Sequence, residues 1–257
     1  MTIINNKIIK NLYSKFTAAL VLLAILINQS EAQVPNSFND QLDQYLANDK
    51  NVEKILSRLR EVGMKLQQKE MEERKKMQDE NIKSLTKNFN PGHSPVWGNA
   101  NAKVTIIEFS DFECPYCKKG ADTLEEVKKK YNQNDIRVVF KNYPLPFHKN
   151  AEPAARAALA ANVQGKFWEM YKELFNNQKS LSEEFFIDTA KKIGLDVAKF
   201  RADYSSEKII SQVKKDEEEG KKFGVSGTPA FFVNGQLLEG AQPIEEFVKV
   251  IDKELKK

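Results

Sequence analysis

Cys114 and Cys117 are the only two cysteines in this chain of 257 residues, and only two residues separate them. The β-branched run at 104–109 predicts a buried strand leading to the pair, and a helix pattern to about residue 130 follows it. A disulfide across so short a loop constrains the unfolded chain very little. A secreted protein that relies on cysteine for stability usually carries several pairs at scattered spacings. The pair is therefore predicted to be chemically reactive rather than a structural cross-link.

The first 32 residues have the pattern of a cleavable export signal. Three lysines precede an apolar run at 16–27, and the small residues Ser30 and Ala32 favour cleavage after Ala32. The apolar run is shorter than the roughly 20 residues that span a bilayer, which favours cleavage over a retained membrane anchor. We therefore expect a soluble mature protein in an oxidising compartment such as a bacterial periplasm.

Charge and ligand content restrict what the chain can bind. The formal net charge of +4 is too small to indicate nucleic acid as a partner. A zinc site needs about four ligands, and besides the cysteines the chain has only His93 and His148 as soft ligands. We therefore expect neither a metal nor another cofactor.

The position of the pair at the start of a helix favours disulfide exchange. Unpaired N–H groups and the positive end of the helix dipole stabilise a thiolate on Cys114 and lower its pKa below about 8.5. Cys117, one turn further on, can attack a mixed disulfide and release the partner. Pro115 has no N–H, so it restrains this turn and removes one donor to the sulfur.

The segment 33–92 is predicted to be an N-terminal helical extension. Five apolar residues follow the 3-4 spacing of a coiled-coil seam; they are Val52, Ile55, Leu59, Val62 and Leu66. The seam predicts a homo-oligomer formed through residues 33–90, and a helix folded back on its own domain is the alternative. Turn residues at 88–92 mark a domain boundary.

The order of elements after this boundary is distinctive. A strand at 104–109, the helix that follows it and a strand at 136–140 form the start of a parallel α/β sheet. About 70 residues of helix, roughly 150–223, then interrupt the pattern. Asn150 is expected to cap the first of these helices, and Ser180 with Glu183 a later one. A strand at 229–233, an Asn-Gly hairpin and a helix at 244–255 complete the chain.

Residues 95–257 resemble the DsbA-like thiol-disulfide oxidoreductases. The stretches that carry the resemblance are IIEFSDFECPYC, FHKNAEPAARAALAA and GVSGTPAFFVNG. The resemblance implies an α/β thioredoxin-like fold at 93–257 with an inserted helical domain. The N-terminal α-helical extension is similar to that of ScsC-type proteins.

The resemblance also assigns roles to individual residues. Cys114 is the implied nucleophile, Cys117 the resolving cysteine, and Pro229 a cis-proline that faces the pair. X–Pro bonds are the only ones that adopt cis at low cost, and the Thr228 backbone is then available to pair with substrate. Pro115 and Tyr116 are further expected substrate contacts.

Glu108 lies six residues before Cys114, at the position of a buried acid in this family. There the carboxylate would accept or relay the proton of Cys117. The alternative is an ordinary polar strand residue that faces solvent.

The resemblance implies a protein-disulfide oxidoreductase that acts on exported cysteine-containing proteins. A membrane redox partner, either a quinone-linked reoxidase or a thiol reductase, would reset it. Strongly oxidising members usually carry histidine within the pair, whereas Tyr116 supplies no positive charge near neutral pH. A milder oxidant is therefore predicted, so an oligomeric isomerase or reductase stays open, and a non-catalytic thioredoxin-fold chaperone is a third candidate.

Overall fold

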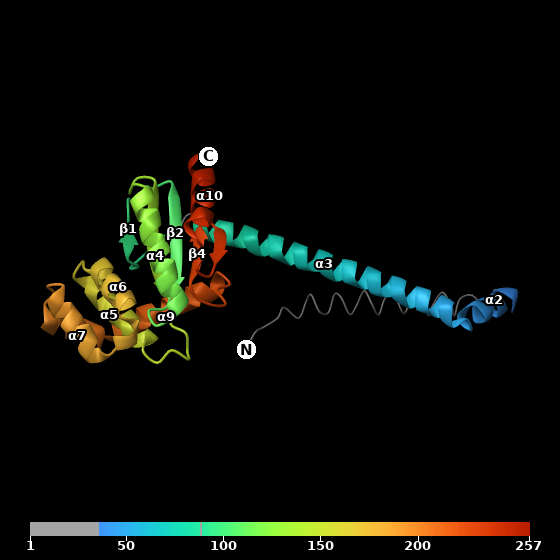
Figure 1. Cartoon of the computed structure of the whole chain (residues 1–257), viewed down its shortest axis with the longest axis horizontal. Helices are drawn as coiled ribbons and strands as arrows, with labels where there is room; N and C mark the ends of the chain where they lie inside the picture. The colour runs from blue at the N-terminus through green and yellow to red at the C-terminus, as the bar shows by residue number, and fades with distance from the viewer. Residues whose placement is uncertain (1–35, 88) are drawn as a thin grey trace. The chain divides into compact units, whose positions relative to one another are not determined.

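The computed structural model describes residues 36–87 and 89–257 (Figure 1). The predicted export signal, residues 1–32, lies outside the described residues. The chain divides into two compact units, one up to Glu73 and the other from Arg74 to Lys257. Within the described ranges, no helix is both long enough and apolar enough to cross a membrane.

The described part of the first unit is helical. It contains α2 (Asn36–Leu46) and the first part of α3 (Asp49–Lys87). The two helices are interrupted at Asn48, whose side-chain oxygen accepts a hydrogen bond from the Lys50 N–H at 3.0 Å and so begins a new helix. Four residues of the predicted seam have exposed side chains, and Leu59 is the most exposed of them at 62%; they are Ile55, Leu59, Val62 and Leu66.

The boundary of the second unit differs from the prediction at 88–92, because it falls within α3. The last turns of α3 contribute to the core of the second unit through Ile82, which is buried in one cluster with Phe223 and Phe232. Burial of an apolar side chain fixes this end of the helix to the domain. The chain therefore already contacts the second unit at Ile82, before it reaches the turn residues at 88–92.

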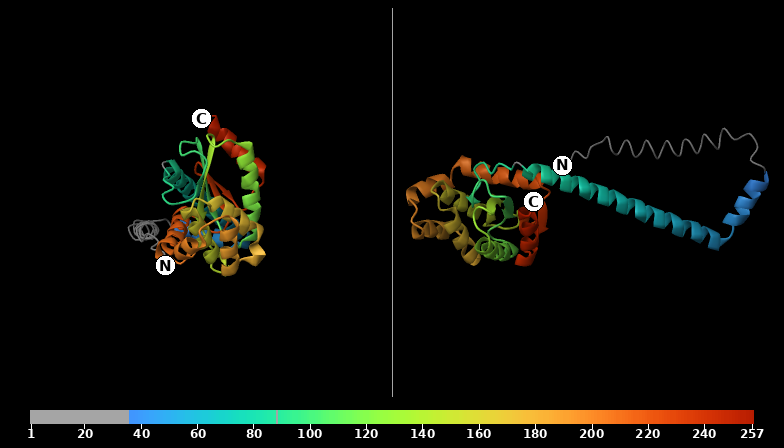
Figure 2. Two further views of the ribbon diagram at one scale, coloured as in Figure 1. Left: turned by 90° about the vertical axis from the view of Figure 1, so that its left-hand side faces the viewer. Right: turned by 90° about the horizontal axis from the view of Figure 1, so that it is seen from above.

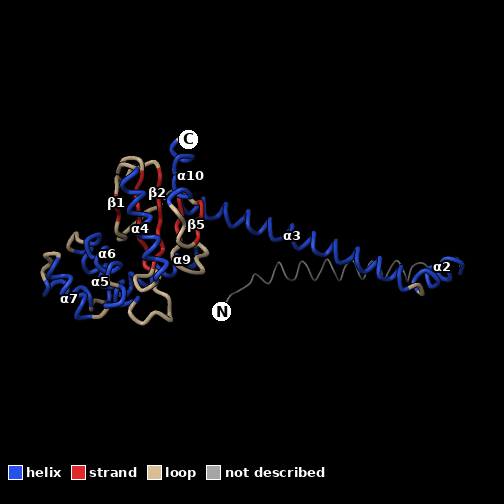
Figure 3. The backbone as a smooth tube through the Cα atoms, viewed as in Figure 1, coloured by secondary structure: helices blue, strands red, loops and turns tan. Residues whose placement is uncertain are grey.

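The second unit is built on a five-stranded sheet in the order β1-β3-β2-β4-β5 (Figure 3). The strands are β1 (Val96–Trp97), β2 (Val104–Ser110), β3 (Ile136–Asn142), β4 (Ala230–Val233) and β5 (Gln236–Glu239). β2 and β3 are parallel, as predicted, and the other neighbouring strands are antiparallel. β1 was not predicted from the sequence, because its two residues are too few to show a pattern.

Helices cover both faces of this sheet. Leu124 and Val127 of α4 (Pro115–Lys130) share one apolar cluster with Phe247 of α10 (Ile244–Leu255), and the two helices lie along the sheet in Figure 1. The opposite face packs against the end of α3 and against Phe223, which follows α9 (Glu207–Lys222). Alternate residues of β2 enter the two clusters, which is why the whole strand is buried.

The inserted helices gather at one end of the sheet (Figure 2). They are α5 (Ala151–Val163), α6 (Phe167–Asn176), α7 (Glu183–Lys192), α8 (Val197–Tyr204) and α9. The predicted Ser180 cap is wrong, because Ser180 lies in a 3-10 turn and the Ser182 hydroxyl accepts from the Phe185 N–H instead. Asn150 does precede α5, but its side chain makes no capping hydrogen bond.

The Asn-Gly hairpin between β4 and β5 is confirmed. Asn234 and Gly235 have φ angles of 45° and 88°, the left-handed region that a tight hairpin turn requires. The Asn234 side chain also accepts a hydrogen bond from the Thr105 N–H at 2.8 Å. The turn is therefore fastened to the start of β2.

Candidate active site

The two thiols lie at the N-terminus of α4. Cys114 is the residue that precedes the helix, and its carbonyl oxygen accepts from the N–H groups of Cys117 at 3.1 Å and Lys118 at 3.2 Å. Both cysteines are free thiols, Cys117 fully buried and Cys114 4% exposed. Pro115 and Tyr116 are exposed beside them. The outer sulfur is thus the one that a partner can reach.

The Thr228–Pro229 peptide bond is cis, as the sequence analysis predicted. The Cys114 thiol donates to the Thr228 carbonyl oxygen at an S–O distance of 3.6 Å, so the proline loop faces the outer sulfur. Gly120 permits this approach of α4, since a Cβ there would lie 3.1 Å from Pro229 and 2.9 Å from Phe231. The structure therefore brings together residues that are more than a hundred positions apart.

The surroundings of the two sulfurs separate their proton affinities. The pKa of Cys114 is lowered to about 6, chiefly by the hydrogen bond from the Cys117 thiol and further by backbone N–H groups of the first helical turn. Burial is the main cause that raises the pKa of Cys117, and the neighbouring Cys114 adds to it. Near neutral pH Cys114 is therefore the thiolate and Cys117 keeps its proton.

Glu108 is fully buried in the middle of β2, so the solvent-facing alternative is wrong. Burial raises the pKa of Glu108 to about 7, against the opposing effects of the Lys128 charge and of the Ser110 and Tyr171 hydroxyls. The Tyr171 hydroxyl donates to the carboxylate at 3.2 Å. The carboxyl group can therefore both take and give a proton near neutral pH.

Asp111 is a buried anchor that the sequence analysis missed. One carboxylate oxygen accepts from the Glu113 N–H at 2.7 Å, and the other accepts from the Leu145 N–H at 2.8 Å and lies 2.7 Å from His148 Nδ1. Its backbone N–H donates to the Cys117 sulfur at 3.4 Å. The sequence could have indicated this role, because Asp111 stands three residues before the pair and an aspartate side chain often accepts a hydrogen bond from the backbone N–H two residues on.

Gln178 links the inserted helical domain to the same turn. Its amide nitrogen donates to the carbonyl oxygens of Phe112 at 2.8 Å and Cys114 at 2.9 Å. No local pattern indicates such a role, because the contact joins segments more than 60 residues apart.

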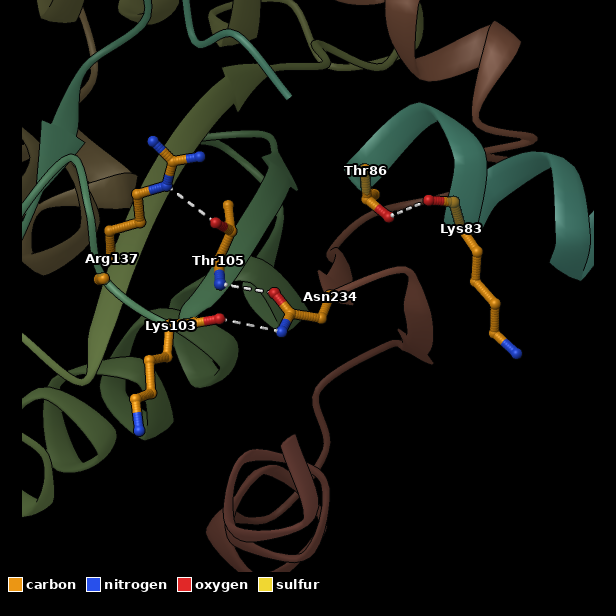
Figure 4. A pocket seen from close by; sticks show the side chains of 7 residues that line it. Lys83, Thr86, Lys103, Thr105, Arg137 and Asn234 are labelled. Carbon is orange, nitrogen blue, oxygen red and sulfur yellow. Dashed lines mark hydrogen bonds between the residues drawn. The ribbon is translucent and has the colours of Figure 1, made fainter. Parts of the chain in front are cut away.

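A separate pocket of about 410 Å³ contains none of the predicted site residues (Figure 4). Its lining is basic, but the Lys83 and Lys103 side chains extend in different directions, and the Arg137 guanidinium is occupied by bonds to Thr105 and two carbonyl oxygens. We therefore attribute a structural role, rather than a ligand-binding one, to the residues that line this pocket. Within the described part of the chain, no three His, Cys, Asp or Glu side chains converge as metal ligands would.

A thioredoxin-type sheet with inserted helices, and a thiol pair at a helix N-terminus opposite a cis-proline, define a thiol-disulfide oxidoreductase of the DsbA-like class. A sequence profile described as Thioredoxin matches residues 90–253, which is more than half of the chain. The chain belongs to this thioredoxin family.

Individual relatives agree with that assignment. A thioredoxin-like oxidoreductase from Silicibacter pomeroyi is 27% identical, with a TM-score of 0.60 over 68% of this chain and 97% of that one. ScsC of Proteus mirabilis, in a transitional conformation, shares the fold over 86% of this chain and 99% of its own, with a TM-score of 0.58 and 23% identity.

A Na(+)/H(+) antiporter NhaA 1 of Mycolicibacterium gilvum is 32% identical over 171 residues, or 65% of this chain. The chain spans about 28% of the length of that relative. The similarity therefore concerns only part of the antiporter sequence.

Proposed function

We propose that the protein exchanges disulfides with exported cysteine-containing proteins in the periplasm. The observation that carries this proposal is the thiolate-forming Cys114 facing the cis bond before Pro229. The export-signal pattern at 1–32 supports the compartment. A membrane redox partner, quinone-linked or reducing, would return the pair to its starting state.

In the oxidising direction, a substrate thiolate attacks the Cys114 sulfur of the enzyme disulfide, and the bond to Cys117 breaks. A second substrate thiolate then attacks its partner's sulfur, forms the substrate disulfide and releases Cys114 as a thiolate. Two electrons pass from substrate to enzyme. In the reshuffling direction, Cys114 attacks a substrate disulfide, and Cys117 resolves the mixed disulfide if the substrate does not.

Glu108 is the group we assign to the Cys117 proton. The Cys117 sulfur is buried and holds its proton strongly, so a free thiolate there is unfavourable. With a pKa of about 7, Glu108 gives a proton when the Cys117 thiolate leaves and accepts it when Cys117 attacks.

The reduction potential of the Cys114–Cys117 pair tests the direction. A potential near about −120 mV favours net oxidation, whereas about −180 mV or lower favours the isomerase. The potential should fall by about 60 mV per pH unit below the Cys114 pKa of about 6 and by about 30 mV per unit above it, because one proton fewer is then taken up. Equilibration with glutathione between pH 4 and 8 measures the reduction potential and its slope with pH.

Reactivation of scrambled ribonuclease tests the non-catalytic chaperone alternative. Absence of any cysteine-dependent reactivation would support the chaperone instead.

We further propose that α3 forms a homo-oligomer through the seam residues, whose exposure supports this role. Assembly would place several redox sites around one substrate and raise their effective concentration. Sedimentation of the mature chain should then give an oligomer, and Leu59→Asp should convert it to a monomer.

Ser57→Asp is the matched control for this experiment, because residue 57 is exposed and lies outside the 3-4 seam. It should leave the sedimentation coefficient unchanged. A mature chain that sediments as a monomer at all concentrations excludes the oligomer.

A further inference from the structure

The backbone N–H of Asp111 is placed to act on the Cys117 sulfur. With both thiols reduced, it donates to this sulfur at an N–S distance of 3.4 Å. The contact is shielded from water, because Asp111 is 1% exposed and Cys117 is fully buried. A hydrogen bond to a charged acceptor is stronger than one to a neutral acceptor, and more so in a buried site. This bond therefore stabilises the sulfur most when the sulfur becomes negative.

Negative charge develops on Cys117 when the enzyme disulfide opens. A thiolate of the substrate or of glutathione bonds to the Cys114 sulfur, the Cys114–Cys117 bond breaks, and its electron pair stays on the Cys117 sulfur. Burial disfavours this thiolate and raises the pKa of Cys117. A fixed N–H donor that points to where charge develops lowers the barrier to such a step. The Asp111 N–H has that position.

The side chain of Asp111 fixes the direction of its own N–H group. Its carboxylate accepts from the backbone N–H groups of Glu113 and Leu145, and it lies 2.7 Å from His148 Nδ1. A carboxylate only accepts, so His148 Nδ1 carries the hydrogen of this contact. His148 therefore supplies a side-chain donor to Asp111, whereas the other two donors belong to the backbone.

His148 belongs to the segment that joins β3 to α5. Its side chain is 18% exposed, and the centre of its ring is 4.6 Å from the centre of the Phe147 ring. Two residues later in the same segment, the Asn150 N–H donates to the carboxylate of Glu113. The segment is therefore attached at more than one point to the turn that precedes the thiol pair, and His148 is its side-chain link to Asp111.

We propose that the Asp111 N–H stabilises the Cys117 thiolate as it leaves the disulfide, and that His148 is the positioning residue that holds Asp111 in place for this step. The inference rests on the proposed exchange of disulfides through Cys114 and Cys117. It is separate from the role proposed for Glu108, which protonates the same sulfur, because the N–H group acts before a proton arrives.

The test measures how fast glutathione reduces the enzyme disulfide at pH 7. His148→Phe keeps a ring beside Phe147 but removes the donor to Asp111, and it should slow the reduction about tenfold, because a hydrogen bond to a developing charge is weakened. His148→Asn supplies a side-chain N–H in place of Nδ1 and should restore most of the rate. His93→Phe makes the same change at an exposed position and should leave the rate unaltered.

Two spectroscopic readouts distinguish positioning from a general loosening of the site. The Asp111 amide proton resonance of the reduced protein should move upfield in His148→Phe, as it should in Cys117→Ala, which removes the acceptor. The pKa of Cys114 should stay at about 6 in His148→Phe, since the groups that lower it are unchanged. An unchanged rate, an unchanged amide resonance or a raised Cys114 pKa in the folded variant overturns the inference.

Asp111→Asn keeps the test valid if His148→Phe does not fold. The change replaces an acceptor oxygen with a donor nitrogen, so the reduction should again slow about tenfold. Where both variants fold, the double variant should be no slower than Asp111→Asn, and additive losses would show that His148 does not act through Asp111. An unchanged rate in Asp111→Asn also overturns the inference.

The wild-type protein separates this inference from the proposed function. If its disulfide forms no mixed disulfide with glutathione on Cys114, the proposed exchange is wrong, and the inference falls with it. If the wild type reacts and the folded His148→Phe variant reacts equally fast, the exchange stands and only the role of His148 is wrong.

Discussion

Cys117→Ala is expected to turn the protein from a catalyst into a trap for its partners. Cys114 still forms mixed disulfides, but no second thiol of the enzyme can resolve them. Turnover in reductive exchange should fall by about a thousandfold or more, as with the loss of other residues that act as one unit. Incubation with a disulfide-containing peptide, followed by mass spectrometry, should show a one-to-one adduct on Cys114.

Cys114→Ser is the matched control for the trap. The remaining thiol, Cys117, is fully buried and keeps its proton near neutral pH, so no adduct should accumulate. An adduct of comparable yield in Cys114→Ser would contradict the assignment of nucleophile and resolving cysteine.

Cys117→Ala also tests why the pKa of Cys114 is low. The hydrogen bond from the Cys117 thiol is the largest effect that lowers the Cys114 pKa to about 6, so Cys117→Ala should raise it, as thiolate absorbance would show. Because this pKa lies below the unfolded value of about 8.5, the thiolate stabilises the folded reduced protein. That stabilisation is complete above the unfolded pKa and is lost as the pH falls through about 6.

Local sequence was sufficient to predict the position of the thiol pair at a helix N-terminus, the strand that leads to it and the Asn-Gly hairpin. Each depends on residues adjacent in the chain: a turn needs positive φ, and a helix N-terminus needs only the residues that form it. The cis bond before Pro229 was foreseen from the resemblance of the flanking residues rather than from physical chemistry alone.

The electrostatic surroundings of Glu108 could not be predicted in the same way. Lys128 stands in a lysine-rich helix end that has the pattern of a solvated face, and only the approach of Trp168 and Trp97 buries it. Tyr171 has the spacing of an ordinary core residue of α6. These roles depend on how the inserted helices dock, which no local periodicity encodes.

Phe140 of β3 shows how that docking is stabilised. Its ring is fully buried, and it lies 5.2 Å from the Phe112 ring and 5.1 and 5.5 Å from the rings of Phe167 and Tyr171 of α6. Phe112 immediately precedes the turn to the thiol pair. One aromatic cluster therefore joins the sheet, the inserted helices and the segment before the active site.

Phe140→Ala is expected to lower the free energy of unfolding by about 3–5 kcal/mol, because the change removes buried apolar surface and leaves a cavity where three elements meet. Urea unfolding of the reduced protein followed by far-UV circular dichroism measures the loss. Phe147→Ala is the matched control: that ring is 75% exposed, so its removal should change the free energy of unfolding by no more than about 0.5 kcal/mol. Equal losses in the two variants would show that the cluster around Phe140 does not hold the insertion to the sheet. If Phe140→Ala also changes the pKa of Glu108, the same packing positions the Tyr171 hydroxyl against the Glu108 carboxylate.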